Sequence, residues 1–372
     1  MRRGPTTLTG SQGSRAIGVV SGFVLKLARQ SAALTQEKLA DVFRVDVTTV
    51  QGWESGRRPL AGMNTGDFLR LSGRLSRLGA PASTGRDLRE AIEADQVLST
   101  GVTAEGTWAD ADTHPLAGSV HRWTITNLIT WPITGKMPHH LHKFTAKVPR
   151  RGPAPTYPSL GADERIRFLD HLLSVAERST HADEALLRRQ AVYLLGFDGR
   201  QQVIDWLRAE WNRAGRRSVK HGDITGLLEA RSASVALASA GDGTHLHDFV
   251  DHVTDTRAEV ANLNYWAHWI GELNEEQTSD AFMSDADTRS WTGVRLLQHL
   301  MNRLEPDSPH LPLNLHTLHA LIASRPSLLS GRPAVCALLA EVLDKLSSTD
   351  RLPRTGRDQL AGLQYALRIA DR

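Results

Sequence analysis

Helical periodicity dominates this chain and limits the folds that are open to it. Beyond about residue 160, Leu and Ala recur at the three- and four-residue spacing of an amphipathic helix, and runs of β-branched residues are absent. Gly, Pro, Asp or Ser occupy the short connections, where these residues stop helices. The pattern predicts helices over residues 163–178, 182–196, 200–214, 223–240, 244–253, 256–271, 285–304, 311–324, 332–347 and 355–370. Helices joined by such short turns predict an all-α fold of stacked antiparallel pairs.

Segments that cannot continue a helix divide the chain into regions. Residues 1–15 are rich in Gly, Ser and Thr, which predicts a disordered tail. Four prolines fall within ten residues of one another inside 146–162, so we predict a Pro-rich linker there. The rest of the chain then forms a helical domain at 16–80, a helical connecting region at 81–145 and an all-helical domain at 163–372.

The connecting region shows two helical patterns of its own. The first covers residues 86–100, and Gly101 is expected to end it. The second covers residues 120–131, and Pro132 is expected to stop it.

Charge is unevenly distributed along the chain. The total of 44 Lys+Arg against 41 Asp+Glu gives a net charge of only +3. Residues 1–79 contain 12 basic and 5 acidic residues, a balance of +7, whereas residues 80–372 have a balance of −4 and contain all 16 histidines. A compact basic region is typical of a nucleic-acid-binding domain, because Lys and Arg release counterions from phosphates.

Composition argues against several other classes of protein. The single cysteine, Cys336, excludes a disulfide framework and a cysteine-based zinc module, and it fits a cytoplasmic protein. No apolar run reaches the roughly 18 residues of a membrane span, so we expect no membrane partner. Histidines cluster at His139, His140 and His142 and in two later groups, but none has the partners of a known zinc motif, so we expect no metal ion and no cofactor. We find no catalytic constellation and do not expect an enzyme.

Two short helices are predicted near the N-terminus. Thr35 is placed to cap a helix over residues 36–43, and Asp46 is placed to cap a second helix over residues 47–54. Gly56 then supplies the left-handed stop after the second helix.

These two helices are predicted to cross and to share a small core. Its members are the apolar residues Leu39, Ala40, Val50 and Trp53. The outward side of the second helix then carries Val47, Thr48, Gln51 and Gly52, whose small size suits a helix lying in a major groove. Arg57 and Arg58 follow directly and can reach phosphates.

The segment over residues 21–78 resembles the helix-turn-helix of the XRE (Cro/C1-type) family. The resemblance rests on Leu34-Thr35-Gln36, on Leu39-Ala40 and on Trp53-Glu54-Ser55-Gly56. It implies a five-helix DNA-binding domain of a transcriptional regulator, in which Gln36 contacts a phosphate. It also implies a partly buried ion pair between Arg29 and Glu54. At fuller length the chain resembles actinobacterial members that append a long all-helical domain.

The predicted DNA-binding residues follow from this placement. They are Thr35, Gln36, Arg44, Asp46, Val47, Thr48, Thr49, Gln51, Gly52, Arg57 and Arg58. Arg44 stands in the turn where the family often has Gly, so we expect a remodelled turn and a phosphate contact from Arg44. Because no bidentate reader occupies the base-reading positions, we expect modest direct readout supplemented by DNA shape.

The sequence Asn262-Leu263-Asn264-Tyr265-Trp266-Ala267-His268-Trp269 is the most unusual helical run. One interpretation is a concave face, lined by Asn262, Tyr265, Trp266 and Trp269, that holds an effector such as an extended peptide. The other is ordinary packing between helices, which is the commoner use of aromatic residues.

Two hypotheses of function follow. The first is a sequence-specific transcriptional regulator that binds double-stranded DNA as a homodimer. Its C-terminal helices, arranged like tetratricopeptide repeats, would dimerise and sense a peptide, a small molecule or a protein partner. The alternative is a protein-interaction scaffold. In that case the helical-repeat body is the functional part, and the DNA-binding head is vestigial or serves only to tether the body.

Overall fold

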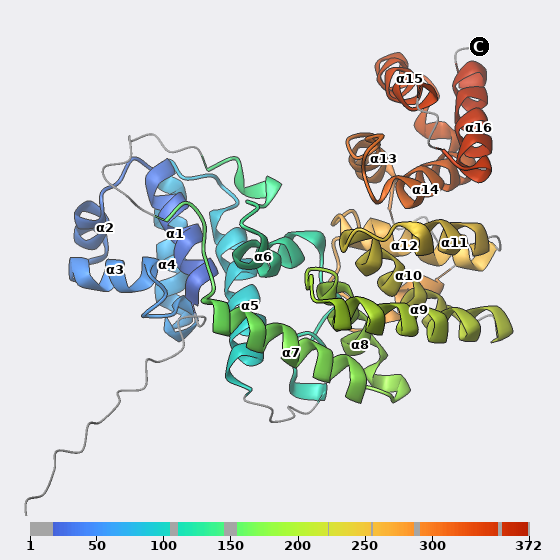
Figure 1. Ribbon diagram of the computed structural model, residues 1–372. Coiled ribbons are helices and arrows are strands. Elements are labelled where there is room, and N and C mark those ends of the chain that lie inside the picture. The colour runs from blue at the N-terminus through green and yellow to red at the C-terminus, as the bar shows by residue number, and fades with distance from the viewer. Residues whose placement is uncertain are drawn as a thin grey trace, which may run out of the picture. The chain divides into compact units, whose positions relative to one another are not determined.

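The computed structural model describes residues 18–104, 111–144, 155–221, 223–253, 256–285, 291–348 and 352–370, and the regular elements in this part of the chain are helices joined by turns and loops (Figure 1). None of these residues lies in a β-strand, so the predicted all-α class is confirmed. The predicted tail at 1–15 and most of the predicted linker lie outside the described residues. Among the described helices, none is both long and apolar enough to cross a membrane.

The helices follow one another with short connections. They are α1 (Val19–Ser31), α2 (Gln36–Phe43), α3 (Val47–Glu54), α4 (Thr65–Arg77), α5 (Thr84–Thr103), α6 (Trp123–Thr134), α7 (Ala162–Arg178), α8 (Ala185–Leu195), α9 (Gln201–His221), α10 (Ile224–Ser239), α11 (Thr244–His252), α12 (Thr256–Trp269), α13 (Val294–Met301), α14 (Leu311–Ser324), α15 (Pro333–Ser347) and α16 (Arg354–Ala370).

Several predicted helix boundaries were wrong, and one of them is the end of α9, which reaches His221 instead of residue 214. Gly101 lies inside α5 instead of ending it, and α6 continues through Pro132 to Thr134. Pro132 stands in the last turn, where it interrupts a hydrogen bond without ending the helix. The helix predicted over 285–304 is reduced to α13, because Trp291 is buried ahead of it and its indole nitrogen donates to Asn264 Oδ1 at 3.1 Å.

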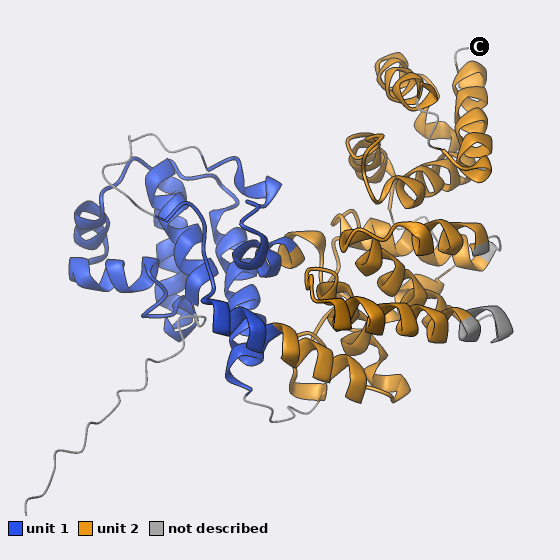
Figure 2. Ribbon diagram, in the orientation of Figure 1, with its two compact units in different colours: residues 1–107, 127–168 blue, residues 108–126, 169–372 orange. Residues whose placement is uncertain are grey.

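The chain divides into two compact units (Figure 2). Unit 1 comprises residues 1–107 and 127–168, and unit 2 comprises residues 108–126 and 169–372. These limits differ from the predicted boundary near residue 80, because α5 packs on α1 and on α4. The fifth helix of the N-terminal domain is therefore α5, which the sequence had assigned to a separate connecting region.

The N-terminus of α1 is capped by a side chain from α5. Gly18 precedes α1 and offers no side-chain cap. The two carboxylate oxygens of Asp95 accept hydrogen bonds from the backbone N–H groups of Val20 and Ser21, each at 2.9 Å. Asp95 is only 2% exposed, and burial raises the pKa of its carboxyl to about 7. The first helix of the N-terminal domain is thus oriented by a residue that lies outside the helix-turn-helix.

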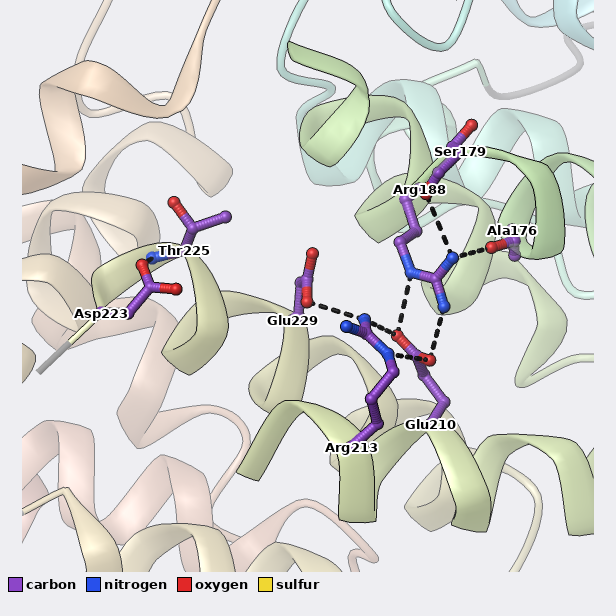
Figure 3. A network of polar contacts seen from close by, with 8 residues as sticks. All are labelled: Ala176, Ser179, Arg188, Glu210, Arg213, Asp223, Thr225 and Glu229. Carbon is purple, nitrogen blue, oxygen red and sulfur yellow. Dashed lines mark hydrogen bonds and ion pairs between the residues drawn. The ribbon is translucent and has the colours of Figure 1, made fainter. Parts of the chain in front are cut away.

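Within unit 2, a partly buried ionic network joins α8, α9 and α10, with Arg188, Glu210 and Glu229 buried and Arg213 exposed (Figure 3). Glu210 receives hydrogen bonds from Arg188 Nε at 3.0 Å and from Arg213 Nε at 2.9 Å. Arg213 also donates to Glu229 at 2.8 Å, and Arg188 donates to the carbonyls of Ala176 and Ser179 at the end of α7. Each arginine is thereby matched by a carboxylate, which offsets the cost of burying the charges.

The other helices of unit 2 pack both on neighbours in the chain and on more distant helices. Helix α10 is buried over most of its length and contacts α8, α9 and α11, while α14 contacts α11, α12, α13 and α16, and α15 contacts α16. This arrangement is compatible with the predicted helix pairs, and tetratricopeptide-like stacking stays a prediction.

We predict that Asp95 makes the stability of unit 1 fall as the pH rises from about 4 to about 7. The folded state holds the Asp95 proton up to about pH 7, whereas the pKa of an unburied aspartate carboxyl is 3.8. Because the folded state binds more protons in this window, the free energy of unfolding decreases as the pH rises. The Asp95→Asn variant has no carboxyl to titrate at this position. Hydrogen exchange of the α1 amides should therefore show that the wild type loses stability between pH 5 and pH 8 relative to the variant. A constant difference between the two proteins would contradict this account.

Candidate nucleic-acid interface

A buried ion pair fixes α3 against α1. Arg29 donates from Nε to Glu54 Oε1 at 2.5 Å and from Nη2 to Glu54 Oε2 at 3.0 Å, and the two side chains are 10% and 5% exposed. The remaining guanidinium nitrogen, Nη1, donates to the carbonyl of Leu34 at 2.7 Å. The ion pair expected from the family resemblance is therefore present, and it also holds the connection between α1 and α2.

The turn between α2 and α3 keeps the left-handed conformation that Gly would adopt. Arg44 has φ 53° and ψ 48°, so the expected remodelling of the turn was wrong. Val45 donates to the carbonyl of Ala40 at 3.1 Å, which closes the end of α2. A non-Gly residue in this conformation costs about 1–2 kcal/mol, so the surrounding contacts must hold the turn in place.

The ends of both helices lie where the sequence placed them. Thr35 caps α2, with its hydroxyl accepting from the backbone N–H of Lys38 at 3.2 Å. Asp46 precedes α3 in an extended conformation, but its side chain makes no capping hydrogen bond. Gly56 has φ 75°, and a Cβ there would lie 2.8 Å from the backbone carbon of Gly18. Only Gly can take this turn and still let the start of α1 approach.

The outward side of α3 is partly as predicted. Leu39, Ala40 and Val50 are buried in the shared core, whereas Trp53 is only half-buried. Thr48 and Gln51 are exposed, and Val47 and Thr49 are half-buried. The exposed positions leave polar side chains available to a groove.

Gly52 is not exposed on the outward side of α3, because the Arg58 side chain covers it. A Cβ on Gly52 would lie 3.0 Å from Cδ and 3.1 Å from Cγ of Arg58. The backbone N–H of Arg58 donates to the carbonyl of Gly52 at 3.0 Å, and its guanidinium donates to Thr49 Oγ1 at 2.7 Å. The Arg58 side chain thus lies along α3 and carries its positive charge to the middle of that helix.

The other predicted contact residues are exposed, apart from Gln36. Arg44, Asp46 and Arg57 are exposed, and Arg57 Nε donates to Ser55 Oγ at 3.1 Å. Gln36 is half-buried, and its amide nitrogen donates to Glu54 Oε2 at 2.7 Å.

Sequence reasoning missed the contribution of Arg74 on α4. Its guanidinium lies 5.8 Å from the ring centre of Phe43 and donates to the carbonyl of Val42. This contact fastens the end of α2 to α4, and only the basic face of α4 hinted at it.

The expected effector face is an interior contact in unit 2. Asn262, Tyr265 and Trp266 are each 6% exposed or less, so the prediction of an open peptide-binding face was wrong for them. The Asn262 amide is used internally, accepting from Arg231 at 3.3 Å and donating to Thr317 at 3.1 Å.

Aromatic packing explains the rest of that run. The Arg231 guanidinium lies 4.0 Å from the ring centre of Tyr265, and burial lowers the pKa of Arg231. Tyr265 stacks on Trp269 with the ring centres 5.9 Å apart. Only Trp269 among the four predicted residues is partly exposed.

Among the described residues, metal-ligating side chains gather in one place, at Asp87, Glu90 and His140 of unit 1. The histidines were noticed in the sequence, but their acidic neighbours lie about fifty residues earlier.

We predict that Glu54→Gln destabilises unit 1 by about 3–5 kcal/mol, because it leaves the Arg29 guanidinium buried without a counter-charge. Denaturant unfolding of the full chain, with hydrogen exchange of α1 and α3, measures the loss. Arg70→Gln is the matched control, since the Arg70–Asp67 pair is 73% and 47% exposed and should be worth less than about 1 kcal/mol. Equal, small effects of the two variants would show that the buried pair does not hold α3.

Comparison with known proteins agrees with this geometry. A helix-turn-helix family model matches residues 25–63, which run from the middle of α1 to just beyond α3. No curated protein and no solved structure matched the chain significantly. With Arg29, Glu54 and the α2–α3 turn arranged as described, the N-terminal part of this chain is an XRE-type helix-turn-helix, the DNA-binding domain of a family of transcription regulators.

Proposed function

We propose that this protein is a sequence-specific transcriptional regulator that inserts α3 into the major groove of an operator. The observation that carries the proposal is the outward side of α3, where Thr48 and Gln51 are exposed and Arg58 lies alongside. The buried Arg29–Glu54 pair holds this surface in a fixed orientation, so its polar groups are preorganised for a groove. We also propose that the protein acts in the cytoplasm, the compartment that its single cysteine favours.

The reading of bases is assigned to two kinds of residue. Thr48 and Gln51 present short polar groups that can bond base edges or contact a thymine methyl. Arg58 supplies the planar, five-donor group that the recognition helix itself lacks, and such a group pairs bidentately with guanine. Arg44 and Arg57, which are exposed at the two ends of α3, are assigned to phosphates.

We predict that DNA affinity falls steeply with salt. A protein that makes about 6–10 phosphate contacts loses roughly 10³–10⁵-fold in affinity between 50 and 200 mM salt. Fluorescence anisotropy on sequences selected by the purified chain measures this slope. No DNA binding at either salt concentration would reject the proposal and favour an interaction scaffold with a vestigial head.

We predict that Arg58 changes sequence preference whereas Arg57 does not. Arg58→Lys keeps the charge but loses the bidentate fork, so it should remove about 1–3 kcal/mol of discrimination at one base pair. Gly52→Ala should act in the same direction, because a Cβ there displaces Arg58. Arg57→Lys is the matched control and should leave the selected consensus unchanged. If Arg58→Lys selects the wild-type consensus, Arg58 contacts only phosphate.

The helical body is proposed to dimerise and to sense a peptide, a small molecule or a protein. Support for self-association comes from exposed apolar side chains on the last two helices, Leu338 on α15 and Tyr365 and Ile369 on α16, which are 51%, 60% and 53% exposed. Tyr365 and Ile369 are four residues apart and share one side of α16. Two copies joined by their bodies can place two copies of α3 on half-sites one helical turn apart.

We predict that the double variant Tyr365→Glu with Ile369→Glu is monomeric, since two carboxylates cannot be buried in an apolar contact without a partner. Analytical ultracentrifugation should give twice the chain mass for the wild type and the single chain mass for the variant. Leu69→Glu is the control, because Leu69 on α4 is equally exposed and lies in unit 1. A wild type that sediments as a monomer contradicts dimerisation through the body.

A further inference from the structure

Three side chains of metal-ligating type converge in unit 1, away from α3. Asp87 and Glu90 stand three residues apart on α5, so they share one side of that helix. His140 comes from the short turn His139–Leu141, far along the chain. One potential ligand atom from each residue lies within 4.8 Å of those from the other two.

The Asp87 carboxylate is held in a way that leaves one oxygen open. Asp87 is fully buried, at 0% exposure. Its Oδ2 accepts from Lys143 Nζ at 2.7 Å and from Ser83 Oγ at 2.9 Å. Its Oδ1 has no hydrogen-bond partner among the described residues. A buried carboxylate oxygen without a donor is costly, so this atom requires another explanation.

Acidic and basic groups surround His140. Asp87 and Glu90 bring two negative charges close together, Lys143 is bonded to Asp87, and Arg86 also acts electrostatically on the imidazole. Neighbouring carboxylates repel each other strongly where water is excluded. A divalent ion between them neutralises this repulsion and supplies the partner for Asp87 Oδ1.

Lys143 and Ser83 then have the role of supporting groups. Carboxylates that bind metals are commonly oriented by hydrogen bonds to their second oxygen, which is the arrangement around Asp87 Oδ2. A simple Lys143–Asp87 ion pair is the competing explanation, but it accounts neither for the open Oδ1 nor for the approach of His140.

We propose that Asp87, Glu90 and His140 form a binding site for a divalent transition-metal ion of the Zn²⁺ class. The imidazole favours such an ion over Mg²⁺ and Ca²⁺, which prefer oxygen ligands. Three protein ligands leave at least one coordination position for water. The ion fastens the turn at residues 139–141 to α5, the helix whose Asp95 caps α1.

Calorimetric titration of the chelator-treated full chain with Zn²⁺, Mg²⁺ and Ca²⁺ tests the proposal. The expected result is one Zn²⁺ per chain, no measurable Mg²⁺ or Ca²⁺ binding, and a higher unfolding temperature of unit 1 with Zn²⁺. His140→Gln should weaken Zn²⁺ binding by more than the roughly 10–100-fold that loss of a supporting partner costs. It should also abolish the thermal shift.

His142→Gln is the matched control, because His142 is exposed and lies two residues from His140 in the same turn region. It should bind Zn²⁺ as the wild type does. The proposal is overturned if the wild type takes up no Zn²⁺, or if His140→Gln binds it as tightly as His142→Gln. Asp87→Asn provides a second test. If this variant stays folded and binds Zn²⁺ with the affinity of the wild type, the proposal is also overturned. None of these outcomes depends on DNA binding.

Discussion

The orientation of α3 depends on one desolvated carboxylate. Glu54 ends α3 and accepts hydrogen bonds from two nitrogens of Arg29 and from the amide of Gln36. Arg29 in turn bonds the carbonyl of Leu34, so α1, the start of α2 and the end of α3 meet at a single ion pair. Buried charges tolerate few alternative positions, because each misplaced donor leaves an unpaired charge in a low-dielectric interior. The left-handed Arg44, whose backbone conformation is unfavourable by itself, lies in a turn closed by the hydrogen bond from Val45 to Ala40.

The N-terminal domain extends further than its motif. Helix α5 packs on α1 and α4, and its Asp95 supplies the cap that the Gly18 position lacks. The proposed metal site lies near the N-terminal end of α5, and Asp95 lies near the middle of the same helix. If an ion orders the N-terminal end of α5, the ordering can be transmitted along α5 to Asp95 and so to α1. Such coupling would require the ion to favour one arrangement of unit 1 over another.

Much of the interface was predictable because short-range rules govern it. Thr35, Gly56 and the apolar residues Leu39, Ala40 and Val50 occupy the expected places, since caps and helical spacing act over a few residues. Gly52 was misjudged because the side chain that covers it, Arg58, lies in the following loop, whose path depends on tertiary packing. The aromatic run in α12 was equally ambiguous. A pattern of Asn, Tyr and Trp fits both a binding face and a core, and the burial of Arg231 beside it settles the choice.

By itself, the sequence determined the all-helical class and the helix-turn-helix, because periodicity, capping and a spaced motif are local properties of the chain. The pairing of Arg29 with Glu54 was implied by the family resemblance that this motif carries. The tertiary structure alone decided which helices share a core and which distant side chains meet. It placed α5 with α1, laid Arg58 along α3, turned Asn262 inward and brought His140 to Asp87 and Glu90. These contacts join residues far apart in sequence, and they form only where packing excludes water and every buried polar group must find a partner.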